Sequence, residues 1–135
     1  MIGTGRPTHR RAALDLGVDV FVDLEGGWVE AVGQVDVVFD VLGGEILDCS
    51  TQLVRAGGTL VTIAEPPRVQ PADARAAFFV VEPDRAKLAV LERRLRKGKL
   101  RSIVGAVLPL SDAVSAFNPA KRVAGKTIIR VVEGS

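Results

Sequence analysis

The sequence has few of the residues that build disulfides, metal centres and nucleophilic triads. Among its 135 residues it contains one cysteine, Cys49, and one histidine, His9. A single cysteine excludes an internal disulfide, and one residue of each type excludes a zinc site built from cysteine and histidine ligands. A Ser-His-Asp triad would have to use His9, which lies in a basic turn without a matching nucleophile motif. We therefore expect no metal site and no such triad within this chain.

Long apolar runs and a strong net charge are also missing. No run of about 18 apolar residues occurs, which excludes a transmembrane helix, and the N-terminus lacks the basic-then-apolar layout of a secretory signal. These two absences predict a cytoplasmic protein without a membrane partner. The formal net charge is only +2, which gives no overall electrostatic field to attract nucleic acid.

One segment, residues 85–101, is nevertheless strongly basic, with eight basic residues against one acidic residue, Glu92. A basic stripe of this kind can bind nucleic acid. Its leucines, however, have the spacing of an ordinary amphipathic surface helix, and no aromatic stacking platform accompanies it. The sequence therefore predicts no nucleic-acid partner.

What is present is a regular alternation of strand-like and helix-like segments. Hydrophobic residues make up 47% and charged residues 25%, as in ordinary globular proteins, and the length suits one domain, residues 1–135. Apolar runs predict strands at 1–4, 18–24, 35–44, 59–64, 76–81, 102–110 and 126–132. Helical spacing predicts helices at 8–16, 25–32, 45–58, 83–99 and 111–117. This order predicts an α/β fold with a Rossmann-like, mostly parallel sheet and helices on both faces.

The helix expected at 45–58 depends on a clear apolar spacing. Ile46, Cys49 and Leu53 recur at three- and four-residue steps, which would place them on one face of a helix. The glycine pair at 57–58 would end this helix. We interpret Cys49 as a core residue on its apolar face.

Four quoted segments, in this order, carry a family resemblance. They are "IGTGRPTHRRAALDLGVDVFVD", "DVVFDVLGGEILDCSTQLVRAGGTLVTIAEPP", "FFVVEPDRAKLAVLERRLRKGKLRSIVGAVLPLSDAVSAF" and "GKTIIRV". Together they resemble the C-terminal part of the coenzyme-binding domain of medium-chain dehydrogenases/reductases, in the zinc-independent, quinone-oxidoreductase-like branch. The resemblance covers nearly the whole chain, and "FDVLGGEIL…LVRAGGTLVTIA" is its most specific part.

The resemblance implies that a first strand, its glycine-rich turn and an N-terminal catalytic domain are absent. In the strand order 3-2-1-4-5-6, the absent first strand would lie between the strands at 1–4 and 35–41. Two facing edges would then have unpaired backbone groups and exposed apolar side chains. The two strands could pair directly, another copy could donate a strand, or a missing N-terminal polypeptide could supply one. We expect a homo-oligomer or association with a missing N-terminal half.

The turn after the first predicted strand points to one cofactor. An acidic residue there favours the 2′-hydroxyl of NAD, whereas basic groups favour the 2′-phosphate of NADP. This turn contains Thr4, Gly5 and Arg6, followed by Arg10, with no carboxylate before Asp15. Both arginines are able to give charge-assisted hydrogen bonds to a phosphate. The pattern predicts NADP(H); the alternative is that the arginines are solvated turn residues.

The resemblance also implies where the rest of the cofactor lies. The residues it assigns to the cofactor are Leu42, Gly43, Gly44, Ile63, Ala64, Phe79, Val80 and Lys126. For each there is a structural alternative: small residues needed by a strand-to-helix turn, a buried or dimer-forming strand at 76–81, and a surface position for Lys126. No catalytic acid, base or nucleophile is named, because hydride transfer in this branch depends mainly on positioning the cofactor.

Two hypotheses follow for function. The first is the NADP-binding portion of a quinone-reductase-like oxidoreductase, which transfers hydride from NADPH to a quinone or an enone or carbonyl substrate and is inactive as this chain alone. The second is a non-catalytic oligomerising or interaction module derived from such a domain.

Overall fold

The computed structural model describes residues 1–117 and 123–132. By its internal contacts the chain divides into two compact units, Met1–Glu82 and Pro83–Ser135. Helical elements separate successive strands in both units, except between the strands Val54–Thr62 and Arg75–Phe78, and every strand pairing in the described residues is parallel. This confirms the predicted α/β class with parallel strands. No helix in the described ranges is long and apolar enough to cross a membrane.

The first unit begins with a two-stranded sheet. β1 (Ile2–Gly5) pairs with β2 (Val20–Asp23) and is joined to it by η1 (Pro7–His9) and α1 (Arg10–Asp15). Phe21 of β2 is buried, and its ring lies against Gly5, where a Cβ would come within 3.4 Å of it. The turn after β1 is therefore packed directly on the neighbouring strand.

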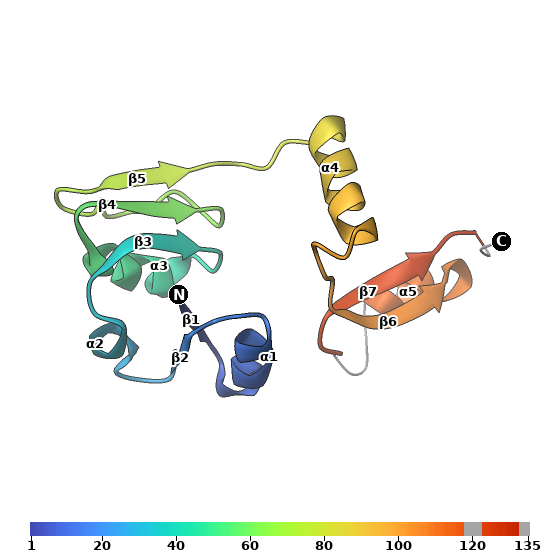
Figure 1. The fold of residues 1–135 in the computed structure, drawn as a ribbon, viewed down its shortest axis with the longest axis horizontal. Helices are drawn as coiled ribbons and strands as arrows, with labels where there is room; N and C mark the ends of the chain where they lie inside the picture. The colour runs from blue at the N-terminus through green and yellow to red at the C-terminus, as the bar shows by residue number, and fades with distance from the viewer. Residues whose placement is uncertain (118–122, 133–135) are drawn as a thin grey trace. The chain divides into compact units, whose positions relative to one another are not determined.

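A separate three-stranded sheet follows in the same unit (Figure 1). Its strands are β3 (Val35–Asp40), β4 (Val54–Thr62) and β5 (Arg75–Phe78), and the other elements are α2 (Trp28–Val32), α3 (Gly44–Ser50) and η2 (Thr51–Leu53). Its core joins Leu47 of α3 to Val54 and Leu60 of β4, with Val38 of β3 packed against them. One face of β3 is thereby covered by α3.

The helix expected at 45–58 is wrong in its second half. The helix ends at Ser50, and the extended backbone begins at Val54, which is buried in the core beside Leu60. Four residues of β4, 55–58, lie opposite the single residue Asp36 of β3 at this point, because Val35 pairs with Val54 and Val37 with Thr59. At Gly58 a Cβ would lie 2.7 Å from the carbonyl oxygen of Asp36, so the glycine permits strand contact and does not end a helix.

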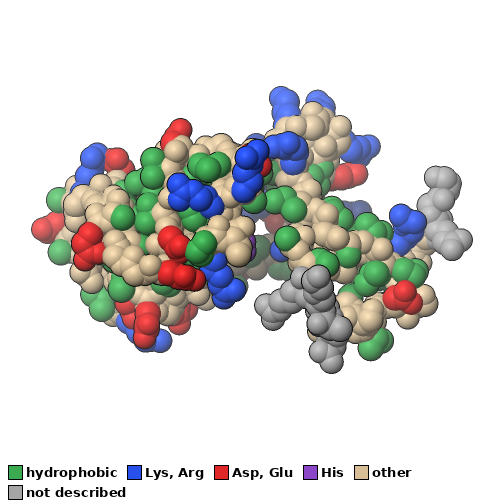
Figure 2. Space-filling view, turned by 90° about the horizontal axis from the view of Figure 1, so that it is seen from below, with side chains coloured by type: hydrophobic (Ala, Val, Ile, Leu, Met, Phe, Trp, Pro, Cys, Tyr) green, Lys and Arg blue, Asp and Glu red, His purple; other side chains and the backbone are tan. Residues whose placement is uncertain are grey.

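The second unit contains a further parallel pair. β6 (Val104–Pro109) pairs with β7 (Lys126–Arg130), and the helical elements are α4 (Arg85–Arg96), η3 (Leu110–Asp112) and α5 (Ala113–Phe117). The Asp84 carboxylate caps α4 by accepting from the Lys87 N–H at 3.0 Å. Hydrophobic side chains reach the surface among charged ones in both units (Figure 2).

Candidate functional site

A groove of about 1100 Å³ lies between the two sheets of the first unit. It is lined along one side by residues 1–6 and along the other by residues 35–43. The described residues of β2 and β4 do not line it. The groove therefore runs along the side of β1 that faces away from β2 and the side of β3 that faces away from β4, which is where the resemblance implies that the first strand of the family's sheet would lie.

Five of the predicted cofactor residues meet at this groove. Thr4, Gly5 and Arg6 line it from the carboxyl end of β1, and Leu42 and Gly43 line it after the carboxyl end of β3. In open α/β sheets, ligands bind outside the carboxyl ends of the strands. The structure thus brings together two predicted segments that are about thirty-five residues apart in the sequence.

A buried carboxylate holds the turn that contains Leu42 and Gly43. Asp40 is 5% exposed, and its Oδ2 accepts hydrogen bonds from the Gly43 N–H and from the Thr62 hydroxyl, both at 3.0 Å. Its Oδ1 accepts a longer bond from the Leu42 N–H at 3.4 Å. Asp40 is not among the site residues predicted from the sequence. Its signal was local: an aspartate just before a glycine turn commonly bonds backbone amides two or three residues later.

Gly43 has little free space around its Cα at the predicted site. Its φ is +73°, a left-handed conformation that side chains rarely adopt, and a Cβ there would lie 3.1 Å from the Cβ of Ala64. Gly43 and Ala64, both predicted cofactor residues, are therefore neighbours. This narrow fit by itself explains why the turn requires a glycine, even when no ligand is bound. The alternative interpretation, that the strand-to-helix turn alone requires small residues here, is therefore compatible with the geometry.

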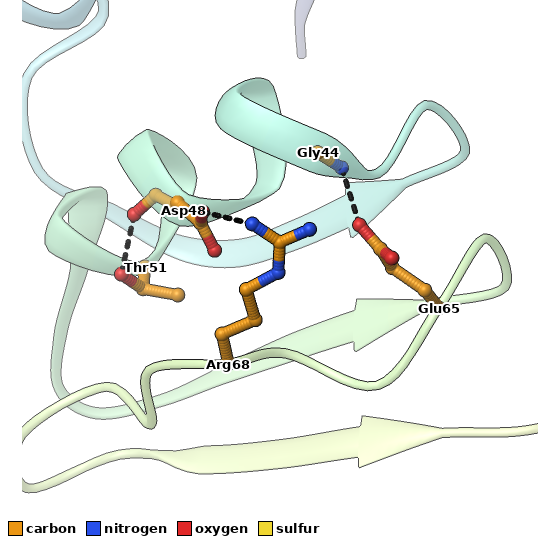
Figure 3. Close-up of polar contacts among 5 residues, drawn as sticks. All are labelled: Gly44, Asp48, Thr51, Glu65 and Arg68. Carbon is orange, nitrogen blue, oxygen red and sulfur yellow. Dashed lines mark hydrogen bonds and ion pairs between the residues drawn. The ribbon is translucent and has the colours of Figure 1, made fainter.

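Glu65 was not predicted, yet it contacts the start of α3. Its Oε1 accepts from the Gly44 N–H at 2.6 Å (Figure 3). Two further contacts in the same view are the Arg68–Asp48 ion pair at 3.8 Å and the hydrogen bond from the Thr51 hydroxyl to the Asp48 carbonyl oxygen at 2.7 Å. The loop after β4 is thus tied to α3 by charged groups. A pattern in the local sequence could not reveal this, because Glu65 and Gly44 are 21 residues apart.

The other predicted cofactor residues do not line the groove. Ile63 donates its N–H to the Asp40 carbonyl oxygen at 3.2 Å, and Phe79 donates to that of Thr62 at 3.4 Å. Val80 follows Phe79 and is exposed, and Gly44 opens α3.

Two basic residues that the sequence predicts to bind the cofactor, Arg10 and Lys126, lie in different environments. The Arg10 guanidinium lies 5.9 Å from the centroid of the Phe21 ring, a cation–π distance, and does not line the groove. Lys126 lies in the second unit at the start of β7, where its N–H donates to the Ile103 carbonyl oxygen at 2.8 Å. The cofactor roles of both residues stay predictions.

A zinc ion does not fit the residues of this structure. Among the residues that it describes, no three His, Cys, Asp or Glu side chains group closely enough to hold a metal ion. Asp40, the carboxylate buried beside the groove, already accepts hydrogen bonds from the backbone and from Thr62.

The comparisons with known proteins agree on one group of enzymes. A family model described as zinc-binding dehydrogenase matches residues 16–129. The protein named "Probable zinc-binding oxidoreductase, mitochondrial", from Arthroderma benhamiae, is 28% identical over 107 residues, which are 73% of this chain and 32% of that protein.

Solved structures extend the likeness to the fold. A protein from Sinorhizobium meliloti 1021 described as an alcohol dehydrogenase is 27% identical, with a TM-score of 0.76 over 95% of this chain and 40% of its own. The quinone oxidoreductase from Coxiella burnetii is 22% identical, with a TM-score of 0.78 over 97% of this chain and 44% of its own. The chain thus spans about a third of the curated relative and less than half of each of these two structures.

Proposed function

This chain belongs to the zinc-binding dehydrogenase family, and from that premise we propose that it is the NADP-binding portion of a quinone-reductase-like oxidoreductase. The family assignment confirms the predicted resemblance to medium-chain dehydrogenases/reductases, which use nicotinamide cofactors. The proposed reaction is hydride transfer from NADPH to a quinone or to an enone or carbonyl substrate. Because the chain spans only part of its relatives, this activity is proposed for the complete enzyme and not for the chain alone.

The observation that carries the proposal is the meeting of two strand ends at one groove. Thr4, Gly5 and Arg6 lie at one side, and the Leu42–Gly43 turn lies at the other. In this arrangement the Arg6 guanidinium would hold the 2′-phosphate, since a planar guanidinium forms paired hydrogen bonds to phosphate oxygens. Gly43, which has no side chain, would let the cofactor lie along the backbone after β3.

The bound cofactor would supply the hydride, and this chain would supply its position. Asp40 holds the Gly43 turn rigid through its hydrogen bonds, which keeps that wall of the groove in place. No step is assigned to zinc, because the described residues of this chain do not fit a zinc site.

A second function keeps support from a specific observation. The chain contains no Gly-x-Gly-x-x-Gly sequence, and its groove has a mainly apolar lining, including Ile2, Val37 and Phe39. A non-catalytic interaction module would use this apolar surface and would not bind nucleotide.

Calorimetric titration with NADPH and NADH tests the two functions. We expect binding of NADPH in the sub-millimolar range and weaker binding of NADH. Replacing Arg6 with alanine should weaken NADPH binding on the order of tenfold, about 1.4 kcal/mol, and leave NADH unchanged, because only NADPH has the 2′-phosphate.

Arg11 provides the matched control for this titration. It is an exposed arginine of α1 that pairs with Asp15 and does not line the groove. Arg11→Ala should leave the affinity for NADPH unchanged. Equal loss in both variants, or no binding of either nucleotide by the unaltered chain, would contradict the proposed function of the groove.

A further inference from the structure

We infer that a hollow in the second unit binds a small anionic molecule with adjoining phosphate groups, of the pyrophosphate type. The hollow has a volume of about 460 Å³ and lies along the C-terminal half of α4. Its lining consists of Val90, Arg93, Arg94, Lys97 and Lys99. All five belong to the second unit, so this inference does not rest on the function proposed for the groove of the first unit.

One helix face and one tight turn bring these side chains together. The first four lining residues follow one another at steps of three, one and three positions, which places them on the same side of α4. The chain then reverses at Gly98, whose φ of +65° is left-handed. After the reversal the Lys99 N–H donates to the Arg94 carbonyl oxygen at 2.9 Å, which returns Lys99 to the helix. Basic side chains gather over α4 in the space-filling view (Figure 2).

Within the described residues, the four cations of the hollow form no ion pair with an acidic side chain. Elsewhere on α4, Lys87 pairs with Asp84 and Arg96 pairs with Glu92. No acidic residue stands three or four positions from any cation of the hollow, and like charges at these spacings repel each other within a helix. The chain thus concentrates positive charge here without neutralising it, and a bound anion would relieve the repulsion.

Backbone hydrogen bonds lessen the repulsion that the end of α4 would exert on an anion. A helix C-terminus ordinarily disfavours negative charge, because its last carbonyl oxygens lack partners. Here the backbone N–H groups of residues 97–100 donate to the carbonyl oxygens of residues 93–95 at distances between 2.9 and 3.2 Å. These oxygens therefore have donors, and the basic side chains set the sign of the charge at the hollow.

The residue types in the hollow favour phosphate groups. A planar guanidinium forms paired hydrogen bonds to phosphate oxygens, and a lysine adds a point charge on a flexible stem. Two residues of each type suit a molecule that carries several negative charges on adjoining groups. The hollow has the size of a small-molecule site. Its lining contains no aromatic side chain on which a base of a nucleic-acid strand could stack, which favours a small molecule over a nucleic acid.

Calorimetric titration of the full chain with inorganic pyrophosphate, at low salt and without nucleotide, tests the inference directly. We expect saturable binding of one pyrophosphate per chain in the sub-millimolar range. Arg94→Ala should weaken this binding by about tenfold or more, because it removes a charge-assisted hydrogen-bond donor. Arg96→Ala is the matched control. It removes the same charge from the same helix, but Arg96 pairs with Glu92 and does not line the hollow, so the affinity should stay unchanged.

A second variant separates loss of the site from loss of the helix. Val90→Glu places a carboxylate in the hollow, three and four positions before Arg93 and Arg94. A glutamate four positions before a basic residue pairs with it within a helix and stabilises the helix. This variant should therefore keep or raise the helix content, measured by circular dichroism, and still lose pyrophosphate binding by about tenfold or more, because the carboxylate occupies the cations.

Three outcomes would overturn the inference. The first is the absence of saturable pyrophosphate binding by the unaltered chain. The second is an equal loss of affinity in the Arg94 and Arg96 variants, which would show attraction to the overall charge of the helix and not to the hollow. The third is tighter binding of a single-stranded oligonucleotide than of pyrophosphate at equal phosphate concentration, which would assign the basic surface of α4 to nucleic acid.

Discussion

At the scale of single residues, the aspartates of β3 show how position decides the importance of a carboxylate. Asp40 is buried and accepts from Gly43 and Thr62, whereas Asp36, four residues earlier, is exposed and pairs with Arg55. The sequence "VDVVFD" presents both as acidic residues of one strand. Only the fold distinguishes a carboxylate that holds a turn from one that forms a surface ion pair.

Replacing Asp40 with alanine is expected to lower the free energy of unfolding of the first unit by about 3 kcal/mol. The change leaves the Gly43 N–H and the buried Thr62 hydroxyl without their acceptor. Asp36→Ala is the control and should cost less than about 1 kcal/mol, as exposed ion pairs do. Urea unfolding followed by the fluorescence of Trp28, the one tryptophan, would measure both. Equal effects would contradict the assigned role of Asp40.

Comparing alanine substitutions at Gly43 and Gly26 separates two contributions to the loss of stability: the unfavourable backbone conformation and the close contact of the new side chain. Gly43→Ala combines a φ of +73° with a Cβ 3.1 Å from that of Ala64, whereas Gly26→Ala combines a φ of +80° with open space. The Gly26 variant should lose about 1 kcal/mol from conformation alone, and the Gly43 variant clearly more. The same fluorescence experiment compares them. A loss at Gly43 no larger than at Gly26 would show that the turn has room for a side chain.

At the scale of elements, the segment after α3 shows where a local pattern misleads. Ile46, Cys49 and Leu53 satisfy the spacing of a longer helix, but the chain leaves the helix after Ser50. Burial of Val54 beside Leu47 and Leu60 favours extended backbone from that point. Helical spacing over two turns cannot compete with strand pairing that buries a core residue, because that pairing involves residues distant in the sequence.

The cap of α4 predicts how this helix responds to acid. The Lys87 N–H and then its ammonium group, both donating to Asp84, hold the pKa of that carboxyl below its ordinary value of 3.8. A lowered pKa in the folded state means that the ionised carboxylate stabilises the helix above the ordinary value. This contribution is lost as the pH falls through the lowered pKa.

Amide exchange of residues 85–96 between pH 5 and pH 2 would measure this dependence. Protection in the unaltered chain should fall as Asp84 protonates. Asp84→Asn retains a capping side chain and should remove most of this part of the pH dependence, whereas Asp84→Ala should lower protection at every pH. An Asn variant with an unchanged pH profile would assign the acid response to another group.

At the scale of the whole molecule, the groove is the feature that links the sequence to the proposed function. The edges of β1 and β3 in the first unit border about 1100 Å³ of open space. Five predicted cofactor residues lie at that groove, and others lie near it or in the second unit. The titration with NADPH and NADH therefore examines this surface directly.

The sequence by itself determined the alternation of strands and helices, the parallel α/β class and the family. These follow from local periodicity and from motifs such as "FDVLGGEIL", which are properties of neighbouring residues. The turn chemistry also pointed to Thr4, Gly5, Arg6, Leu42 and Gly43, which the structure brings to one groove.

Only the tertiary structure decided where β4 begins, which carboxylates hold the turns, and that the groove stays open. Thr62, which donates to Asp40, and Gly44, which donates to Glu65, lie 22 and 21 residues along the chain from these carboxylates, beyond the reach of any local pattern. Whether β1 and β3 meet depends on how two separately packed sheets can approach, each already covered by its own helix. Such contacts are set by three-dimensional packing, which local sequence spacing does not encode.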